Sequence, residues 1–123
     1  MSSGKQSPLR KILENLTTGI QEIEAAAIVS VEGLPIESIL PNEVDEAKIA
    51  AMTAAILSLG ERASMELNKG ELEQVLVRGK NGFLAVQSAG FNACLTVSAS
   101  ADAKLGLVMH YMTQAAKEIE KLI

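Results

Sequence analysis

Hydrophobic residues recur every three to four positions in the first part of the chain, which predicts a helix. Ser7 followed by Pro8 is typical of a helix start, because proline needs no backbone donor in the first turn. The apolar spacing continues to an expected helix end between Gln21 and Glu24. This stripe consists of Leu9, Ile12, Leu13, Leu16, Ile20 and Ile23. Residues 1–6 are small and polar, and we expect them to be a disordered N-terminus.

Two strands joined by a tight turn are predicted next. Residues 25–31 end in a β-branched run, and residues 34–40 return after a turn at Glu32-Gly33. Because Pro35 cannot donate a hydrogen bond to a neighbouring strand, we expect the second strand at an edge of the sheet.

The region from Val44 to Leu67 predicts a long helix with more apolar surface than one core can cover. Asn42 or Asp45 is expected to cap its start, and Gly70 to lie at its left-handed end. At about 100° per residue, apolar and small side chains span roughly 240°, whereas a helix on one core needs little more than about 100°. One stripe comprises Met52, Ile56, Ile49, Leu59, Ala63 and Leu67, another comprises Ala50, Leu57, Ala54, Ala47 and Met65, and Thr53, Gly60 and Ser64 lie between them. The remaining narrow side carries Lys48, Ala51, Ala55, Ser58, Arg62 and Glu66. We expect the surplus apolar surface to pack against a second copy of the protein.

Three further strands follow the long helix. Residues 71–78 alternate between polar and apolar, and Asn81-Gly82 is a strong signal for a hairpin turn. Residues 83–87 and 91–98 are the next two strands. The last of them is apolar on nearly both faces, which favours a central place in the sheet.

The final helix is amphipathic, and we expect residues between Ser98 and Asp102 to cap it. Its apolar stripe consists of Leu105, Val108, Met109, Met112, Ala116, Ile119 and Ile123. The predicted fold class is α+β, in the order α-β-β-α-β-β-β-α, with one five-stranded, mostly antiparallel sheet sandwiched by helices. Residues 7–123 are predicted to form a single domain.

Composition narrows the classes of function. The net charge is −4 and aromatic residues make up 2% of the chain, so nucleic-acid binding is disfavoured for want of basic stripes and stacking platforms. A single cysteine, Cys94, excludes an intramolecular disulfide and a cysteine-based metal cluster. No apolar run approaches the length that spans a membrane, and we expect a cytoplasmic protein without membrane insertion.

Catalytic motifs are absent from the pattern. There is no phosphate-binding loop of the G-x-x-x-x-G-K-[ST] type, and His110 is the only histidine, which disfavours zinc and Ser-His-Asp sites. Cys94 is expected to be a buried, inert thiol. Arg62 has two interpretations, either a solubilising charge paired with Glu66 or part of a flat docking surface with a charged rim. We therefore expect no enzyme, no cofactor and no metal site.

Four segments, taken in order, resemble one family. They are Val31-Glu32-Gly33-Leu34-Pro35-Ile36, the alanine-rich run from Ile49 to Ala63, Gly70 to Gly79, and Lys104-Leu105-Gly106-Leu107-Val108. The element order alone is shared by several folds, including profilin-like and sensor-type domains. These segments are similar to the first hairpin, second helix, third strand and last-helix entry of Roadblock/LC7 domains, and the similarity runs from about Leu9 to Leu122.

The resemblance implies the Roadblock/LC7 (profilin-like) sandwich, with one long helix on one face of the sheet and two helices on the other. It implies a non-enzymatic regulator, since such domains are similar to partner proteins of small Ras-like GTPases and to dynein light chains. It also implies a homodimer that pairs the third strand with its twin and lays the two long helices side by side. The implied dimer interface is Glu71, Leu72, Glu73, Gln74, Val75, Leu76 and Val77 of the strand, with either Ala50, Ala54 and Leu57 or the opposite apolar stripe of the helix. The implied GTPase-docking face is Lys48, Ala51, Ala55, Ser58, Arg62 and Glu66.

Three functions remain open on this basis. The first is a homodimeric regulator or scaffold that reads the switch loops of a small Ras-like GTPase, with Arg62 as a conceivable arginine finger. The second is a structural dimerisation subunit of a larger complex, which would ignore the nucleotide state. The third is a small-molecule sensor with a site between sheet and helix, which the near absence of aromatic residues disfavours.

Overall fold

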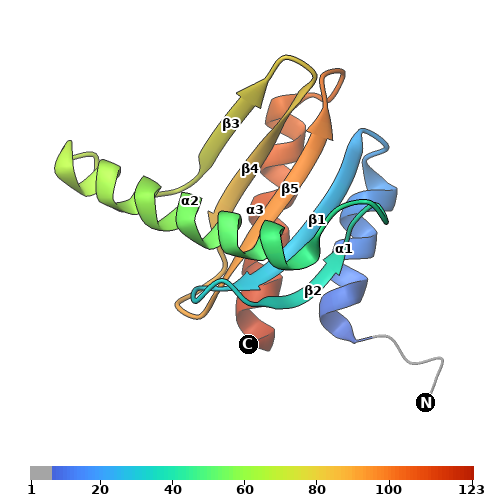
Figure 1. The fold of residues 1–123 in the computed structure, drawn as a ribbon, viewed down its shortest axis with the longest axis horizontal. Helices are drawn as coiled ribbons and strands as arrows, with labels where there is room; N and C mark the ends of the chain where they lie inside the picture. Colours follow the sequence, from blue (N-terminus) through green and yellow to red (C-terminus); the bar gives the residue numbers. More distant parts are fainter. Residues whose placement is uncertain (1–6) are drawn as a thin grey trace.

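A computed structural model describes residues 7–123 as three helices and five strands in the predicted order (Figure 1). The predicted N-terminal tail, residues 1–6, lies outside the described residues. The elements are α1 (Pro8–Gly19), β1 (Ile23–Ser30), β2 (Pro35–Ile39), α2 (Glu46–Glu66), β3 (Val75–Gly79), β4 (Gly82–Ser88), β5 (Ala93–Ser100) and α3 (Leu105–Leu122).

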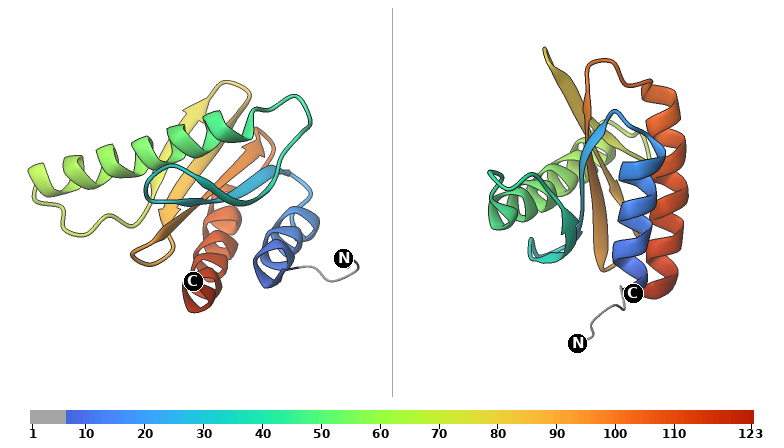
Figure 2. Two further views of the ribbon diagram at one scale, coloured as in Figure 1. Left: turned by 60° about the horizontal axis from the view of Figure 1, so that its bottom comes forward. Right: turned by 90° about the vertical axis from the view of Figure 1, so that its right-hand side faces the viewer.

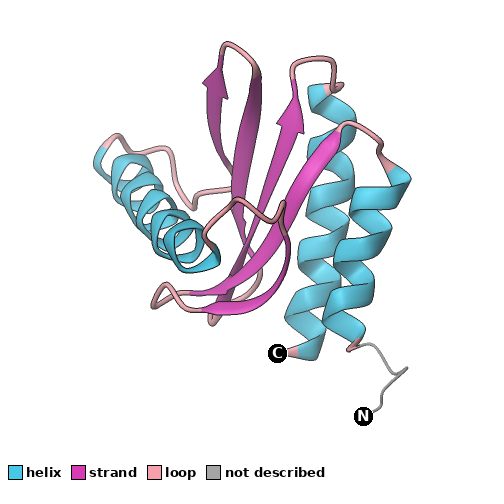
Figure 3. Ribbon diagram, turned by 45° about the vertical axis from the view of Figure 1, so that its right-hand side comes forward, coloured by secondary structure: helices cyan, strands magenta, loops and turns pink. Residues whose placement is uncertain are grey.

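The five strands form one antiparallel sheet in the order β2-β1-β5-β4-β3. The edge position of the strand that carries Pro35 and the central position of β5 are both confirmed. Helix α2 crosses one face of the sheet, and α1 and α3 lie side by side on the other (Figures 2 and 3). The expected layering, one long helix against two, is confirmed.

The two faces of the sheet bury unequal cores. The face under α1 and α3 carries a cluster of seventeen buried side chains, among them Leu13, Ile28, Leu95, Met112 and Ile119. The face under α2 carries only six, namely Ala27, Val29, Ala50, Leu57, Val86 and Cys94. Since apolar burial is the main stabilising term, α2 is held to its own domain by much less surface than α1 and α3 are.

The first helix ends earlier than its apolar spacing predicts. It stops at Gly19, and Ile23, which was expected in the helix, begins β1 instead. The carbonyl of Glu22 accepts a hydrogen bond from the backbone N–H of Ser100 at 2.9 Å, so β5 draws this segment into the sheet. The predicted start of α1 is confirmed, and Ser7 caps it, because its side chain accepts a hydrogen bond from the backbone N–H of Arg10.

The first hairpin has a longer connection than the two-residue turn predicted. Strand β1 ends at Ser30 and β2 begins at Pro35, with Gly33 in the left-handed region at a φ of 93°. A Cβ atom on Gly33 would lie 3.5 Å from the Cα atom of Ala51, so this turn packs closely against α2. Small residues on both sides permit that approach.

Both ends of α2 have recognisable cap structures, whereas α3 starts without the predicted cap. Asp45 caps α2 by accepting hydrogen bonds from the backbone N–H groups of residues 47 and 48, which confirms one of the two expected caps. At the other end Asn68, with a φ of 57°, takes the left-handed position next to the helix, and Gly70, which was expected near this position, is also left-handed at a φ of 85°. The prediction that Ser98–Asp102 caps α3 is wrong, because β5 extends to Ser100 and the N-cap is Lys104, which makes no side-chain cap.

Candidate functional site

Helix α2 uses a narrow stripe to contact its own sheet. Only Ala50, Thr53 and Leu57 are buried along it, and Ala54 is partly buried beside them. Ala50 and Leu57 therefore belong to the core of one subunit, which favours the other expected alternative, the opposite apolar stripe, for the helix part of a dimer interface. The small side chains of Ala50 and Thr53 let the helix lie close to the sheet, which selects this stripe for the core.

The opposite apolar stripe of α2 is left open. Met52 is 52% exposed, Leu59 67% and Leu67 68%, and Ala63 is exposed between the last two. We call these four residues the exposed stripe. In Figure 1 the C-terminal part of α2 runs past β3, so no strand of the same chain lies beneath it. An exposed series of large apolar side chains of this kind marks an interaction surface.

A groove separates the exposed side of α2 from the sheet. It has a volume of about 440 Å³, and its mainly apolar wall includes Ile49, Met52 and Ile56 from the helix and Leu84 from β4. The expected docking face lies on the outer side of α2, away from the sheet. All six of its residues, Lys48, Ala51, Ala55, Ser58, Arg62 and Glu66, are exposed. We call these six residues the outer face.

Arg62 stands free on this outer face. Within residues 7–123, no hydrogen bond or ion pair engages its guanidinium group, so the expected ion pair with Glu66 is not formed. An unpaired arginine beside alanine and serine side chains is available to a partner, since no internal contact has to be broken.

Strand β3 is an open edge of the sheet. It pairs only with β4, through a two-residue connection in which Gly79 faces Gly82. In such a hairpin the residues that flank the turn form a hydrogen-bonded pair, as do every second pair from there on. The backbone groups of Val77 and Val75 therefore point to β4, and those of Leu76 and Arg78 point outward, where another strand could bind them.

The segment Glu71 to Gln74 was expected in this strand, and this boundary is wrong. Strand β3 begins at Val75, because the preceding loop is held against α2. Leu72 and Val75 pack so closely under Gly60 that a Cβ atom there would meet the Val75 side chain at 2.5 Å.

The end of that loop is fixed by side-chain hydrogen bonds. The amide of Gln74 donates to the Gln87 side chain on β4 and to the Thr113 hydroxyl on α3, both at 3.1 Å. The start of β3 is therefore tied to both its neighbouring strand and the helix layer behind it.

One exposed aromatic residue was missed by the sequence analysis. Phe91 was assigned to the last strand, but it lies before β5 and is 95% exposed. Its turn adjoins the first hairpin, since the backbone N–H of Val31 donates to the carbonyl of Asn92 at 3.2 Å. The turn-favouring residues Gly90 and Asn92 on either side were the available signal.

The titratable groups provide little for catalysis. Burial raises the pKa of the Cys94 thiol to about 11, the charge of Glu61 adding to the effect, and the thiol donates to the carbonyl of Val29 at 3.5 Å. A thiol of this kind is a poor nucleophile at neutral pH. His110 is exposed and lies edge-on to Tyr111, with ring centroids 5.4 Å apart. Among residues 7–123, no three His, Cys, Asp or Glu side chains gather in a way that could hold a metal ion.

No helix between residues 7 and 123 has the length and apolar character needed to cross a membrane. The features that this part of the chain does offer are surfaces for protein contact. These are an open strand edge, an apolar helix stripe and a flat outer face.

Comparison with known proteins identifies relatives of the whole domain. The chain matches the Roadblock/LC7 domain over residues 10–99. An uncharacterized protein of Methanocaldococcus jannaschii is 35% identical over 114 residues, which cover 92% of this chain and 96% of that protein.

Solved structures share the fold. The Roadblock/LC7 domain from Streptomyces avermitilis superimposes with a TM-score of 0.87 at 24% identity, covering 94% of this chain and 98% of that one. Myxococcus xanthus MglB does so with a TM-score of 0.86 at 19% identity, covering 96% of both chains.

Proposed function

This chain belongs to the Roadblock/LC7 domain family, and we propose that it is a non-enzymatic homodimer that binds a small Ras-like GTPase through the outer faces of its paired α2 helices. The observation that carries the proposal is the exposure of two sides of α2. Its exposed stripe presents apolar side chains to solvent, and its outer face presents small side chains and one unpaired arginine.

The strand part of the proposed dimer follows from the open edge of β3. An antiparallel twin must pair residues whose backbone groups both point outward, which within β3 are Leu76 and Arg78. Pairing Leu76 with Leu76 of the second copy meets this condition and extends the two five-stranded sheets into one. It sets Gln74 opposite Arg78 of the twin.

The helix part of the interface uses the exposed stripe in place of Ala50 and Leu57. A twofold axis beside β3 lays the overhanging end of each α2 over the other subunit's sheet. Leu59, Ala63 and Leu67 of one copy then approach the groove beside Met52 and Ile56 of the other. Support comes from size and chemistry, since an apolar groove of this volume suits several aliphatic side chains.

The paired outer faces form the proposed platform for the GTPase. A regulator must bind one nucleotide state more tightly, since a tenfold preference corresponds to about 1.4 kcal/mol of coupling and equal binding to both states shifts nothing. A platform that binds both states equally would serve as a scaffold.

The test is isothermal titration calorimetry of the dimer with small Ras-like GTPases of the source organism, each loaded with GDP or a non-hydrolysable GTP analogue. We expect binding in one nucleotide state, loss of binding in Ala55→Glu, and an unchanged dimer in that variant. Binding that ignores the nucleotide would support the scaffold. Absence of binding to every such GTPase would reject the proposal in favour of a structural dimerisation subunit.

A further inference from the structure

The open edge of β3 has charges of opposite sign at its two ends. Glu71 and Glu73 precede the strand, and Arg78 and Lys80 lie at its end and in the following turn. All four are exposed, and within residues 7–123 none of them takes part in an ion pair. The edge therefore carries an acidic half and a basic half, and no ion pair among the described residues neutralises either.

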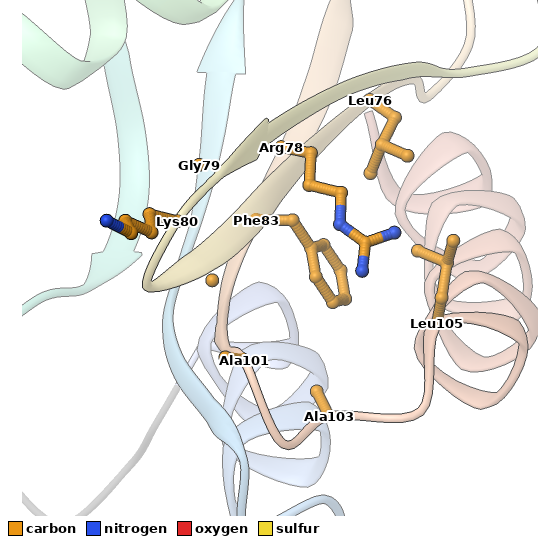
Figure 4. Close-up of a pocket in the computed structure, with 9 residues that line it drawn as sticks. Leu76, Arg78, Gly79, Lys80, Phe83, Ala101, Ala103 and Leu105 are labelled. Carbon is orange, nitrogen blue, oxygen red and sulfur yellow. The ribbon is translucent and has the colours of Figure 1, made fainter.

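The side chains at the basic end point to different faces of the sheet. Figure 4 shows Arg78 reaching past Phe83 toward Leu105, on the face covered by α3. Lys80 also borders that pocket, but its side chain extends away from Arg78, to the other side of the hairpin. Lys80 is thus free to meet groups on the α2 side of a neighbouring strand.

The acidic end lies where both α2 and α3 border the edge of the sheet. The side chain of Gln74 is bonded to Thr113 of α3, and that of Val75 packs under Gly60 of α2. Leu72 packs under Gly60 as well, so residues 71–74 do not alternate between the two faces as a strand does. The carboxylates of Glu61, Glu71 and Glu73 line one open groove there, whose wall includes no lysine or arginine.

We infer that the occupant of this acidic groove is the β3–β4 turn of a second copy, with Lys80 of each subunit lying between Glu71 and Glu73 of the other. The inference rests on the proposed dimer and adds what selects its orientation and partner. Counted on from a Leu76–Leu76 pair, this register brings the turn residue Lys80 beside Leu72 of the other copy, the residue between the two carboxylates.

Antiparallel pairing alone satisfies these charges. It brings the basic end of each edge to the acidic end of the other, twice by symmetry. Parallel pairing would set Glu73 near Glu73 and Lys80 near Lys80, and like charges opposite one another destabilise a sheet. The edge is therefore complementary to itself in one direction only, which also disfavours pairing with chains that lack the same arrangement.

The test separates the two charges onto different chains. One chain carries Lys80→Glu, and the other carries Glu71→Lys and Glu73→Lys. Alone, each chain should dimerise about 10-fold more weakly than the unmodified protein. A single exposed ion pair contributes little free energy, but in each homodimer all the pairs become like-charge pairs, at both symmetry-related sites. Mixed in equal amounts, with one chain fluorescently labelled, they should form heterodimers well above random pairing in sedimentation velocity.

A matched control places the same changes of charge elsewhere. Lys117→Glu in one chain, and Glu32→Lys with Glu118→Lys in the other, lie away from β3 and should leave homodimers and random mixing intact. Raising salt from about 0.05 M to about 0.5 M should weaken the unmodified dimer several-fold, because the Debye length shortens to a few ångströms. The same rise in salt should have little effect on the dimerisation of a triple variant that carries Glu71→Gln, Glu73→Gln and Lys80→Gln, because these charges are absent from it.

The outcomes are distinguishable. Random mixing of the charge-separated chains, or equal heterodimer formation by the control pair, would overturn the inference and leave the proposed dimer standing. Binding of a lysine-rich synthetic peptide at the groove of an intact dimer would assign the groove to another protein and also overturn it. An unmodified protein that is monomeric at micromolar concentration would reject the dimer itself.

Discussion

Replacing Leu57 should weaken the fold of the subunit, whereas replacing Met52 should weaken the dimer, although the two residues are little more than one helical turn apart on α2. Leu57 is 5% exposed and packs with Ala27, Val29 and Val86. Truncating a buried leucine to alanine costs about 2–5 kcal/mol, and small domains have about 5–15 kcal/mol in total. Leu57→Ala should therefore lower the free energy of unfolding by that amount and leave the surface that meets a second copy unchanged.

Met52→Lys acts on the other side of the helix. Met52 is already 52% exposed, so the substitution should change the stability of the isolated subunit by less than about 0.5 kcal/mol. Covering its exposed half in a dimer is worth about 1–1.5 kcal/mol per subunit, and symmetry doubles this. We expect a dimer dissociation constant about 30- to 150-fold higher.

The assay combines urea unfolding at low protein concentration with sedimentation equilibrium over a concentration series. The expected result is a folded monomer for Met52→Lys and a destabilised dimer for Leu57→Ala. A Met52→Lys variant that unfolds like Leu57→Ala would show that both sides of α2 are already covered within one subunit. A Met52→Lys variant that dimerises normally would mean that the exposed stripe is not at the interface.

Three further predictions concern single residues. Because Cys94 has a folded pKa of about 11 and an ordinary value of 9.0, the unfolded chain loses this proton first, so stability should fall between pH 9 and pH 11. The loss should be of order 2 kcal/mol in urea unfolding and absent in Cys94→Ala. Gly60→Ala should lower the melting temperature despite better helix propensity, because its Cβ atom would lie 2.5 Å from the Val75 side chain; an unchanged or higher value would contradict this. Asp45→Ala should cost about 1 kcal/mol by chemical unfolding through loss of the α2 cap, whereas Asp45→Asn should retain most of it.

Most of the fold was predictable because its signals are local. Helical spacing, the two-residue turn before Gly82 and the missing donor of Pro35 indicated the element order, a hairpin and an edge strand. The end of α1 was not predictable in this way. Ile23 suits a helix stripe and a strand equally well. Only pairing with β5, far away in the chain, places it in the sheet, where Ile23 lies opposite Ala99 and the backbone N–H of Ser100 donates to the carbonyl of Glu22.

The sequence by itself determined that α2 has more apolar surface than one sheet can cover, because an arc of side chains depends only on their spacing. It also showed a single histidine and no phosphate-binding loop of the G-x-x-x-x-G-K-[ST] type. Only the tertiary structure decided which part of the arc faces the sheet, since spacing says nothing about how a helix is rotated about its axis. Close approach to the sheet selected Ala50, Thr53 and Leu57 and left Met52 and Leu59 outside. The overhang of α2 likewise decided that Glu71 to Gln74 form a loop, because the chain reaches β4 only at Val75.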